Sequence, residues 1–236
     1  MAAQRFLIYA QPRTGSTWLV DLLNSHPEIE CDSELFNDDY QEMARRLWSR
    51  RLLRKYPIPY MQVRAKTCPY PAYGFKLLHY QTRRSIDLLA KLHQRGWHII
   101  SLRRNQLWNQ AVSDVLAIQT RKYHRTGKDE ARVNPVQIDP NALLNKIAEL
   151  KRYSIEESEA LEGIPHLRIH YEDDLIDENV RDKTLARIHT QLGLSTMPAS
   201  SALLPTYDRP IDQVVANYQE LVEAVKQSCH ADILCI

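Results

Sequence analysis

This 236-residue sequence lacks long hydrophobic runs, paired cysteines and an excess of charge of one sign. No segment approaches the roughly 18 uninterrupted apolar residues of a membrane-spanning helix, and the amino terminus has no basic region followed by a long apolar run. We therefore expect a cytoplasmic protein with neither a signal peptide nor a transmembrane segment.

The cysteines, charges and histidines exclude further classes. Four scattered cysteines without a CxxC pair do not form a disulfide framework, so we expect reduced thiols. Lysine and arginine total 31 and aspartate and glutamate 29, and this formal net charge of +2 does not indicate a nucleic-acid partner. No HExxH motif or convincing histidine set occurs, so no metal site is predicted. Any anion-binding site must therefore be local.

The composition and the order of apolar segments indicate one α/β domain. Hydrophobic residues make up 44% and charged residues 25%, which is ordinary for a globular chain with a sizeable core. Expected strands lie at 6–10, 73–78, 97–102 and 166–170, and expected helices at 16–24, 38–55, 85–94, 105–122, 141–161, 180–192 and 211–226. Segments 57–71 and 123–140 are expected to be loops. This alternation predicts a P-loop-like three-layer domain over 1–236, a mainly parallel sheet flanked by helices that binds its ligand at the carboxyl edge of the strands.

The first motif, Pro-Arg-Thr-Gly-Ser-Thr-Trp at 12–18, follows a buried strand and opens a helix. Backbone N–H groups and the positive end of the helix dipole converge there, as a phosphate site requires. Gly15 allows close approach of the backbone, Ser16 and Thr17 add hydroxyl donors, and Arg13 adds a planar, permanently charged fork. The motif is not GxxxxGK[ST], because it is shorter and lacks the Lys-Ser/Thr pair. The structural alternative is an N-capped helix after a turn.

The second motif follows the strand 97–102, where Arg103, Arg104 and Asn105 precede a helix that carries Ser113. Consecutive arginines at the end of a buried strand are costly unless a negative group meets them. A second anion site is therefore one interpretation. A surface salt bridge beside an exposed arginine is the other.

Together the two motifs resemble PAPS-dependent sulfotransferases, which use 3'-phosphoadenosine 5'-phosphosulfate (PAPS). In that family a P-[KR]-[ST]-G-[ST]-T loop holds the 5'-phosphosulfate and an R-N/D...S element holds the 3'-phosphate. Tyr171-Glu172-Asp173 is similar to the family's Y-E-D-L segment, whose tyrosine lies by the adenine, and Trp18 falls where many members carry an adenine-contacting tryptophan. The resemblance therefore implies that PAPS is bound by Arg13, Thr14, Gly15, Ser16, Thr17, Trp18, Arg104, Ser113 and Tyr171.

Two segments, Ser33-Glu34-Leu35-Phe36 and Gln110-Ala111-Val112-Ser113, are closer in style to the bacterial glycan and glycolipid sulfotransferases. The sequence also departs from the hormone-type pattern. Ser113 lies one residue farther from Arg104 than in that pattern, and the C-terminal Arg-Lys-Gly loop is missing. Arg209 is a weak candidate for the missing cation.

The resemblance implies transfer of a sulfuryl group to a hydroxyl acceptor. The favoured acceptor is a carbohydrate or glycolipid. Arg13 is expected to stabilise the leaving phosphate, and Glu34 to act as general base. His79 is the rival base, because Lys76-Leu77-Leu78-His79 loosely matches the Lys-Thr-His segment of hormone-type enzymes. This match also makes Lys76 a candidate contact of the sulfuryl group. A one-residue shift on a strand reverses the face, which favours a structural His79. No metal is required.

Two other functions stay open, a P-loop-like nucleotide-dependent phosphotransferase and a non-catalytic nucleotide-binding protein. The expected helix has a basic face at 45–55. This face is either simply exposed to water or attracts an anionic glycan or lipid headgroup. The loop 123–140 is either an acceptor-side lid or a plain polar loop. A homodimer is compatible with the sequence, which does not identify the acceptor.

Overall fold

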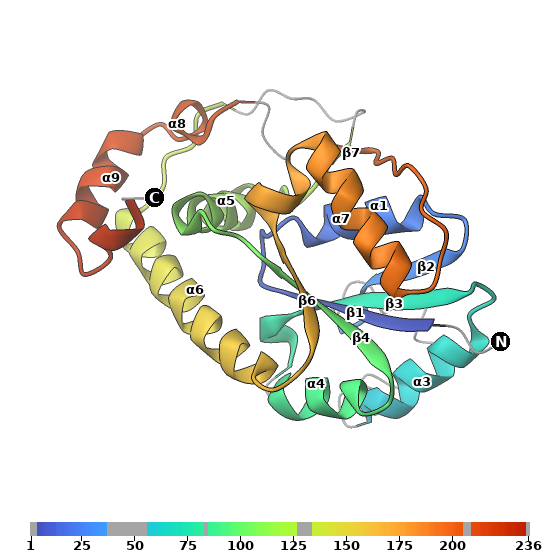
Figure 1. Cartoon of the computed structure of the whole chain (residues 1–236). Helices are drawn as coiled ribbons and strands as arrows, with labels where there is room; N and C mark the ends of the chain where they lie inside the picture. Colours follow the sequence, from blue (N-terminus) through green and yellow to red (C-terminus); the bar gives the residue numbers. More distant parts are fainter. Residues whose placement is uncertain (1–3, 37–55, 83–84, 127–133, 205–208, 235–236) are drawn as a thin grey trace. The chain divides into compact units, whose positions relative to one another are not determined.

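The computed structural model describes residues 4–36, 56–82, 85–126, 134–204 and 209–234. Its strands are β1 (Gln4–Ala10), β2 (Ile29–Glu34), β3 (Ala72–Leu78), β4 (Trp97–Arg103), β5 (Arg125–Thr126), β6 (His166–His170) and β7 (Leu203–Leu204) (Figure 1). Its helices are α1 (Ser16–Asn24), α3 (Pro57–Thr67), α4 (Ser85–His93), α5 (Leu107–Thr120), α6 (Pro140–Leu161), α7 (Glu178–Gln191), α8 (Ile211–Val214) and α9 (Tyr218–Lys226). Short 3₁₀ turns cover His79–Gln81 and Ala231–Leu234, and a π-helical turn covers Tyr171–Leu175.

The chain divides into two compact units. The first comprises residues 1–103 and 157–200, and the second comprises residues 104–156 and 201–236. Helix α6 crosses the boundary and contributes residues from Glu157 onward to the first unit. The single domain over 1–236 stays a prediction.

The first unit contains a five-stranded sheet in the order β2-β3-β1-β4-β6, and every neighbouring pair is parallel (Figure 1). The predicted α/β class with a mainly parallel sheet is thus confirmed. From β1 the chain continues to β2 and β3 on one side of β1, whereas β4 and β6 lie on the other side. The carboxyl ends of β1 and β4 therefore mark the topological switch point, where open α/β sheets bind ligands.

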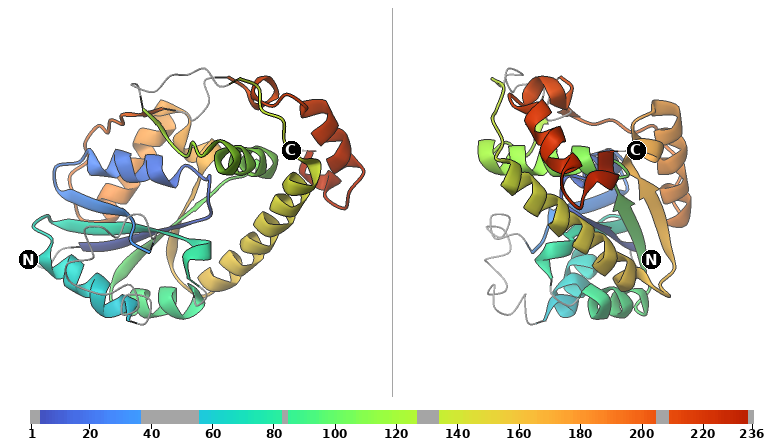
Figure 2. Two further views of the ribbon diagram at one scale, coloured as in Figure 1. Left: turned by 180° about the vertical axis from the view of Figure 1, so that it is seen from behind. Right: turned by 90° about the vertical axis from the view of Figure 1, so that its left-hand side faces the viewer.

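Apolar residues cover both faces of this sheet. Strands that are buried on both sides carry continuous rather than alternating hydrophobic residues. Helices α1 and α7 pack on one face, where Leu19, Leu23 and Ile188 are fully or almost fully buried. Helices α3 and α4, with the end of α6, cover the other face. Figure 2 shows α1 and α7 on one side of the sheet and α3 and α4 on the opposite side.

The second unit has its own apolar cluster, built by α5, the first part of α6, α8 and α9. Lys146 of α6 forms an ion pair with Asp114 of α5 at 3.0 Å. Two residues of β5 pair antiparallel with β7. Among the described residues, no helix combines the length and hydrophobicity required to cross a membrane.

Two sequence predictions are wrong around the second strand. The four prolines of segment 57–71 predict a loop, but Pro57–Thr67 is helix α3. Two prolines lie in its first turn, where no N–H group has an intrahelical partner, and the other two follow its last residue. The sequence pattern does not predict strand β2, because its polar residues Glu30, Asp32 and Glu34 interrupt the apolar run.

A third prediction, one helix at 211–226, is also wrong, because α8 and α9 are separated by an extended Val215. Val215 forms a parallel bridge with Val136, and the side chain of Asn217 exchanges hydrogen bonds with the backbone of Ile138 at 2.9 and 2.8 Å. These tertiary contacts outweigh the helical spacing. The expected helix at 38–55, with its basic segment 45–55, lies entirely outside the described residues, as does 127–133 of the expected loop.

Candidate active site

The loop between β1 and α1 lies at the switch point and has an unusual backbone. Gly15 has φ of +81° and Arg13 has φ of +60°, so both are left-handed. The hydroxyl of Thr14 donates to the carbonyl of Gln11 at 2.9 Å, which closes the turn. The N-cap residue of α1 is Gly15, which has no side chain to cap the helix, and the first-turn N–H groups of a helix point toward its N-terminal loop. The predicted strand, loop and helix are confirmed here.

Tyr171, from a motif about 150 residues later, lies against this loop. A Cβ atom on Gly15 would lie 2.5 Å from Cδ2 of the tyrosine ring. The Tyr171 ring also meets Trp18 edge-on, with centroids 6.1 Å apart, and the guanidinium of Arg181 lies 5.4 Å from the Trp18 ring centroid. Two predicted adenine-side residues are thus neighbours beside the anion loop.

Gly15→Ala is expected to weaken nucleotide binding about tenfold or more and to lower Tm. A left-handed alanine costs roughly 1–2 kcal/mol, and its methyl group collides with the Tyr171 ring. Calorimetric titration and thermal unfolding measure the two effects. Gly163→Ala is the control for left-handed strain alone, because Gly163 has φ of +68° and an added methyl group there would meet no atom within 4 Å. Equal nucleotide affinity in the two variants would contradict a role for the Gly15 contact.

Lys76 connects the anion loop to Glu34. Its ammonium donates to the hydroxyl of Thr17 at 2.7 Å and pairs with Oε1 of Glu34 at 2.8 Å. Gln81 donates to the other oxygen of Glu34 at 2.7 Å. Parallel pairing of β2 and β3 sets Glu34 beside Lys76 in the sheet, which explains how the ends of two strands reach one helix.

The Lys76 side chain is only 1% exposed, so its charge interacts strongly with its surroundings. Burial lowers the pKa of Lys76, and the carboxylate of Glu34 opposes that shift. A buried cation that contacts the helix of an anion loop is a suitable partner for a negative ligand.

His79 begins the 3₁₀ turn that follows β3 and also contains Gln81. Its Nδ1 is 2.6 Å from the hydroxyl of Tyr9, and the ring is 4% exposed. This contact gives the histidine a structural partner. Glu34 and His79 both stay predictions as the general base.

Arg103 and Arg104 belong to different compact units. Arg103 forms an ion pair with the buried Glu157 of α6, with Nε and Oε1 3.3 Å apart. Arg104 begins the second unit, and Ser113 is buried in α5 of that unit. Arg209, the weak candidate cation, is exposed in the second unit. Binding of the 3'-phosphate by Arg104 and Ser113 stays a prediction.

Sequence reasoning missed Gln11, Glu157 and Arg181, and it assigned Lys76 only loosely. The predicted site residues Arg13, Thr14, Gly15, Ser16, Thr17, Trp18, Glu34, His79 and Tyr171 all lie in the first unit. Lys76 had a signal, because it precedes a histidine at the end of a strand. The other three had none, since their contacts join segments distant in sequence.

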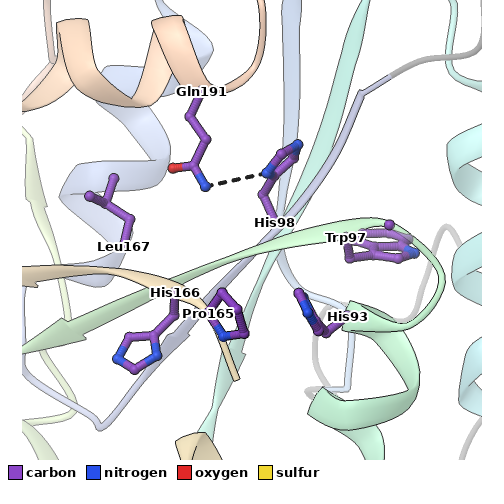
Figure 3. A pocket seen from close by; sticks show the side chains of 8 residues that line it. His93, Trp97, His98, Pro165, His166, Leu167 and Gln191 are labelled. Carbon is purple, nitrogen blue, oxygen red and sulfur yellow. Dashed lines mark hydrogen bonds between the residues drawn. The ribbon is translucent and has the colours of Figure 1, made fainter. Parts of the chain in front are cut away.

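A separate cavity of about 360 Å³ lies at the opposite edge of the sheet, where β4 and β6 begin. It is lined by His93, Gly96, Trp97, His98, Pro165, His166, Leu167 and Gln191. Figure 3 shows Gln191 directed at His98, whose Nδ1 is 3.3 Å from the amide nitrogen. No group of three or more His, Cys, Asp or Glu side chains in the described part of the chain could hold a metal ion. The cavity is therefore distinct from the loop between β1 and α1.

The comparisons with known proteins agree with this geometry. Residues 5–82, about a third of the chain, match the model of the Sulfotransferase family. No curated protein matches the sequence. The matched segment runs from β1 through the anion loop, Glu34 and Lys76 to Gln81.

Solved structures are similar to this chain at low sequence identity. A sulfotransferase from Alicyclobacillus acidocaldarius is 14% identical with a TM-score of 0.51, and the match covers 96% of this chain and 95% of that one. The sulfotransferase domain of the curacin biosynthetic pathway is 15% identical with a TM-score of 0.50, covering 100% and 84%. Mouse sulfotransferase SULT7A1, solved with PAP, is 15% identical with a TM-score of 0.48. There the match covers 82% of this chain but only 60% of the mouse chain. The α/β fold, a five-stranded parallel sheet flanked by helices, is that of sulfotransferases.

Proposed function

We propose that this chain, whose residues 5–82 match the sulfotransferase family, transfers a sulfuryl group from PAPS to a hydroxyl group. Sulfotransferases of this family use PAPS, so the family match implies a PAPS-dependent enzyme. The acceptor that we propose is a sugar or glycolipid hydroxyl. Its support is the sequence style of 33–36 and 110–113, together with a glutamate at the end of β2.

The observation that carries the proposal is the contact of Lys76 with both Thr17 and Glu34. A buried cation and a carboxylate therefore lie beside the helix that follows the anion loop. Sulfuryl transfer needs both groups. The cation stabilises charge on the leaving phosphate, and the carboxylate removes the acceptor proton.

In the proposed reaction Glu34 takes the proton of the acceptor hydroxyl. The acceptor oxygen forms a bond to sulfur while the bond between sulfur and the bridging oxygen of the 5'-phosphate breaks. Arg13 and Lys76 stabilise the negative charge that grows on the departing adenosine 3',5'-bisphosphate (PAP). Arg13 keeps its proton throughout, because a guanidinium does not titrate near neutral pH.

The nucleotide site that we propose consists of the anion loop from Arg13 to Thr17, with Trp18 and Tyr171 on the adenine side. Arg104 and Ser113 are proposed to bind the 3'-phosphate on the strength of the sequence motif. These cations are protein side chains, so we propose that the reaction needs no metal ion.

Calorimetric titration of the protein with PAP and with ADP, both in EDTA, tests the proposal. PAP is expected to bind without metal and more tightly than ADP, because only PAP carries a 3'-phosphate. Arg104→Ala should weaken PAP binding by about tenfold or more and leave ADP binding nearly unchanged. Equal losses for the two nucleotides would contradict the role of Arg104.

Labelled PAPS then serves to screen sugar, glycolipid and phenolic acceptors. Label transfer to a sugar hydroxyl is the expected result. Nucleotide binding that requires Mg²⁺ and prefers ADP would favour a phosphotransferase. Tight PAP binding with no transfer to any acceptor would favour a non-catalytic nucleotide-binding protein.

A further inference from the structure

Arg181 of α7 is a largely buried cation beside the residues that we assign to the adenine side of the nucleotide site. Its side chain is 16% exposed, and its guanidinium lies 5.4 Å from the ring centroid of Trp18. Tyr171, which meets the Trp18 ring edge-on, packs against Gly15 of the anion loop. All four residues belong to the first unit, where α1 and α7 pack on the same face of the sheet.

The donors of this guanidinium are poorly used. Its Nε is buried and has no hydrogen-bond partner among the described residues. Its Nη2 lies 3.5 Å from Oε1 of Glu178, which is longer than the roughly 2.7–2.9 Å of a good charge-assisted hydrogen bond. Glu178 is itself 81% exposed, so water screens this ion pair. The cation of Arg181 can therefore accommodate a further acceptor.

An arginine at this position is costly unless a negative group binds beside it. Burying a charged group is unfavourable when hydrogen bonds and an opposite charge do not compensate for it. Arg181 is also the fourth residue of α7, near the positive end of the helix dipole, where a cation is disfavoured. Stacking on the indole of Trp18 compensates for part of this cost. A bound anion supplies the remaining compensation.

The chemistry of a guanidinium indicates which part of a nucleotide it contacts. It offers five N–H donors and no acceptor, in a planar fork that matches the oxygens of a phosphate. Adenine presents an amino donor beside its ring nitrogen, so its edge matches this fork poorly. A phosphate is therefore the expected partner of Arg181.

The proposed arrangement of the nucleotide identifies that phosphate. The 5' end occupies the anion loop, and the base lies by Trp18 and Tyr171. The ribose joins these two ends and carries the 3'-phosphate. Since the loop already holds the 5' end, the 3'-phosphate is the anionic group that a cation on the adenine side can bind.

We propose that Arg181 is a further nucleotide-binding residue, whose guanidinium is held on the Trp18 ring and donates to the 3'-phosphate. It thereby contributes to a preference for PAP over ADP. This inference rests on the proposed function, because that function assigns the 5' end to the anion loop and the base to Trp18 and Tyr171.

Arg181→Gln tests the inference, because the amide removes the charge and the planar fork but leaves a polar side chain of intermediate length. The expected result is that Kd for PAP rises about tenfold while Kd for ADP changes less than about threefold. Arg181→Lys keeps a charge without the fork, so its PAP affinity should lie between those of the wild type and Arg181→Gln. Calorimetric titration with PAP and with ADP, both in EDTA, measures these constants.

Arg187→Gln is the matched control. Arg187 is an exposed residue of the same helix, so this variant removes the same charge from α7 at the surface. It should keep the wild-type Kd for both nucleotides. Equal losses of PAP affinity in Arg187→Gln and Arg181→Gln would show a general effect of charge and overturn the inference.

The remaining outcomes are also decisive. Unchanged PAP affinity in Arg181→Gln overturns the inference. Equal losses for PAP and ADP in that variant overturn it as well, because they show that Arg181 acts on a part that both nucleotides share. A wild-type protein without preference for PAP over ADP overturns the proposed function, whereas a wild-type preference that survives in Arg181→Gln overturns only the role of Arg181.

Discussion

Glu34→Gln is expected to lower kcat for sulfuryl transfer by about 10²- to 10⁴-fold, the usual contribution of a general base. The glutamine keeps the shape of the side chain beside Lys76 and Gln81, which hold the two carboxylate oxygens at 2.8 and 2.7 Å. It cannot take the proton of the acceptor hydroxyl. PAP affinity should change little, because no contact of Glu34 with the nucleotide is assigned. Steady-state kinetics and calorimetric titration measure the two quantities separately.

His79→Asn distinguishes Glu34 from its rival. The His79 ring is buried, and its Nδ1 lies 2.6 Å from the hydroxyl of Tyr9, so its replacement should act mainly on stability. We expect a much smaller loss of kcat than in Glu34→Gln. A large loss for His79→Asn with full activity for Glu34→Gln would assign the base to the histidine instead.

Local sequence signals correctly predicted the strand, loop and helix over residues 6–24. The apolar run of β1 and the turn at Gly15 that opens α1 depend on neighbouring residues, so their pattern identifies them. The strand before Tyr171 was found in the same way. The four prolines of segment 57–71 led to the prediction of a loop where α3 lies, because composition alone did not show that they lie at the two ends of the helix.

The polar contacts of the site depend on strand register and could not be predicted. Lys76 contacts Glu34 only because β2 pairs with β3. The sequence pattern does not identify β2 as a strand, because polar residues interrupt it. Glu157 contacts Gln11 across 146 residues of sequence, a separation at which no periodic pattern exists. A single glutamate on a long helix looks like any solvated charge until the fold places it at the switch point.

Lys76→Met is expected to lower kcat by about 10²- to 10³-fold, as loss of a preorganised cation at the developing charge does. Methionine fills the space of the buried stem but cannot donate to Thr17 or pair with Glu34. Glu34 keeps its hydrogen bond from Gln81, so the fold should persist. Thermal unfolding measures the stability of each preparation, and fixed-time transfer assays with labelled PAPS measure its rate.

The pH dependence tests whether the charge of Lys76 is what matters. Burial disfavours the charged form and lowers the pKa of Lys76 below its ordinary 10.5, so the ammonium is lost at a lower pH than that of a free lysine. The rate of the wild-type protein should therefore decline on the alkaline side before pH 10.5, and Lys76→Arg should remove this decline, because a guanidinium stays protonated there. Measurements of kcat from pH 7 upward with both proteins decide the point. The same alkaline decline in Lys76→Arg, or a Lys76→Met protein that keeps the wild-type rate, would show that the cation of the reaction lies elsewhere, with Arg13 as the remaining assignment in the anion loop.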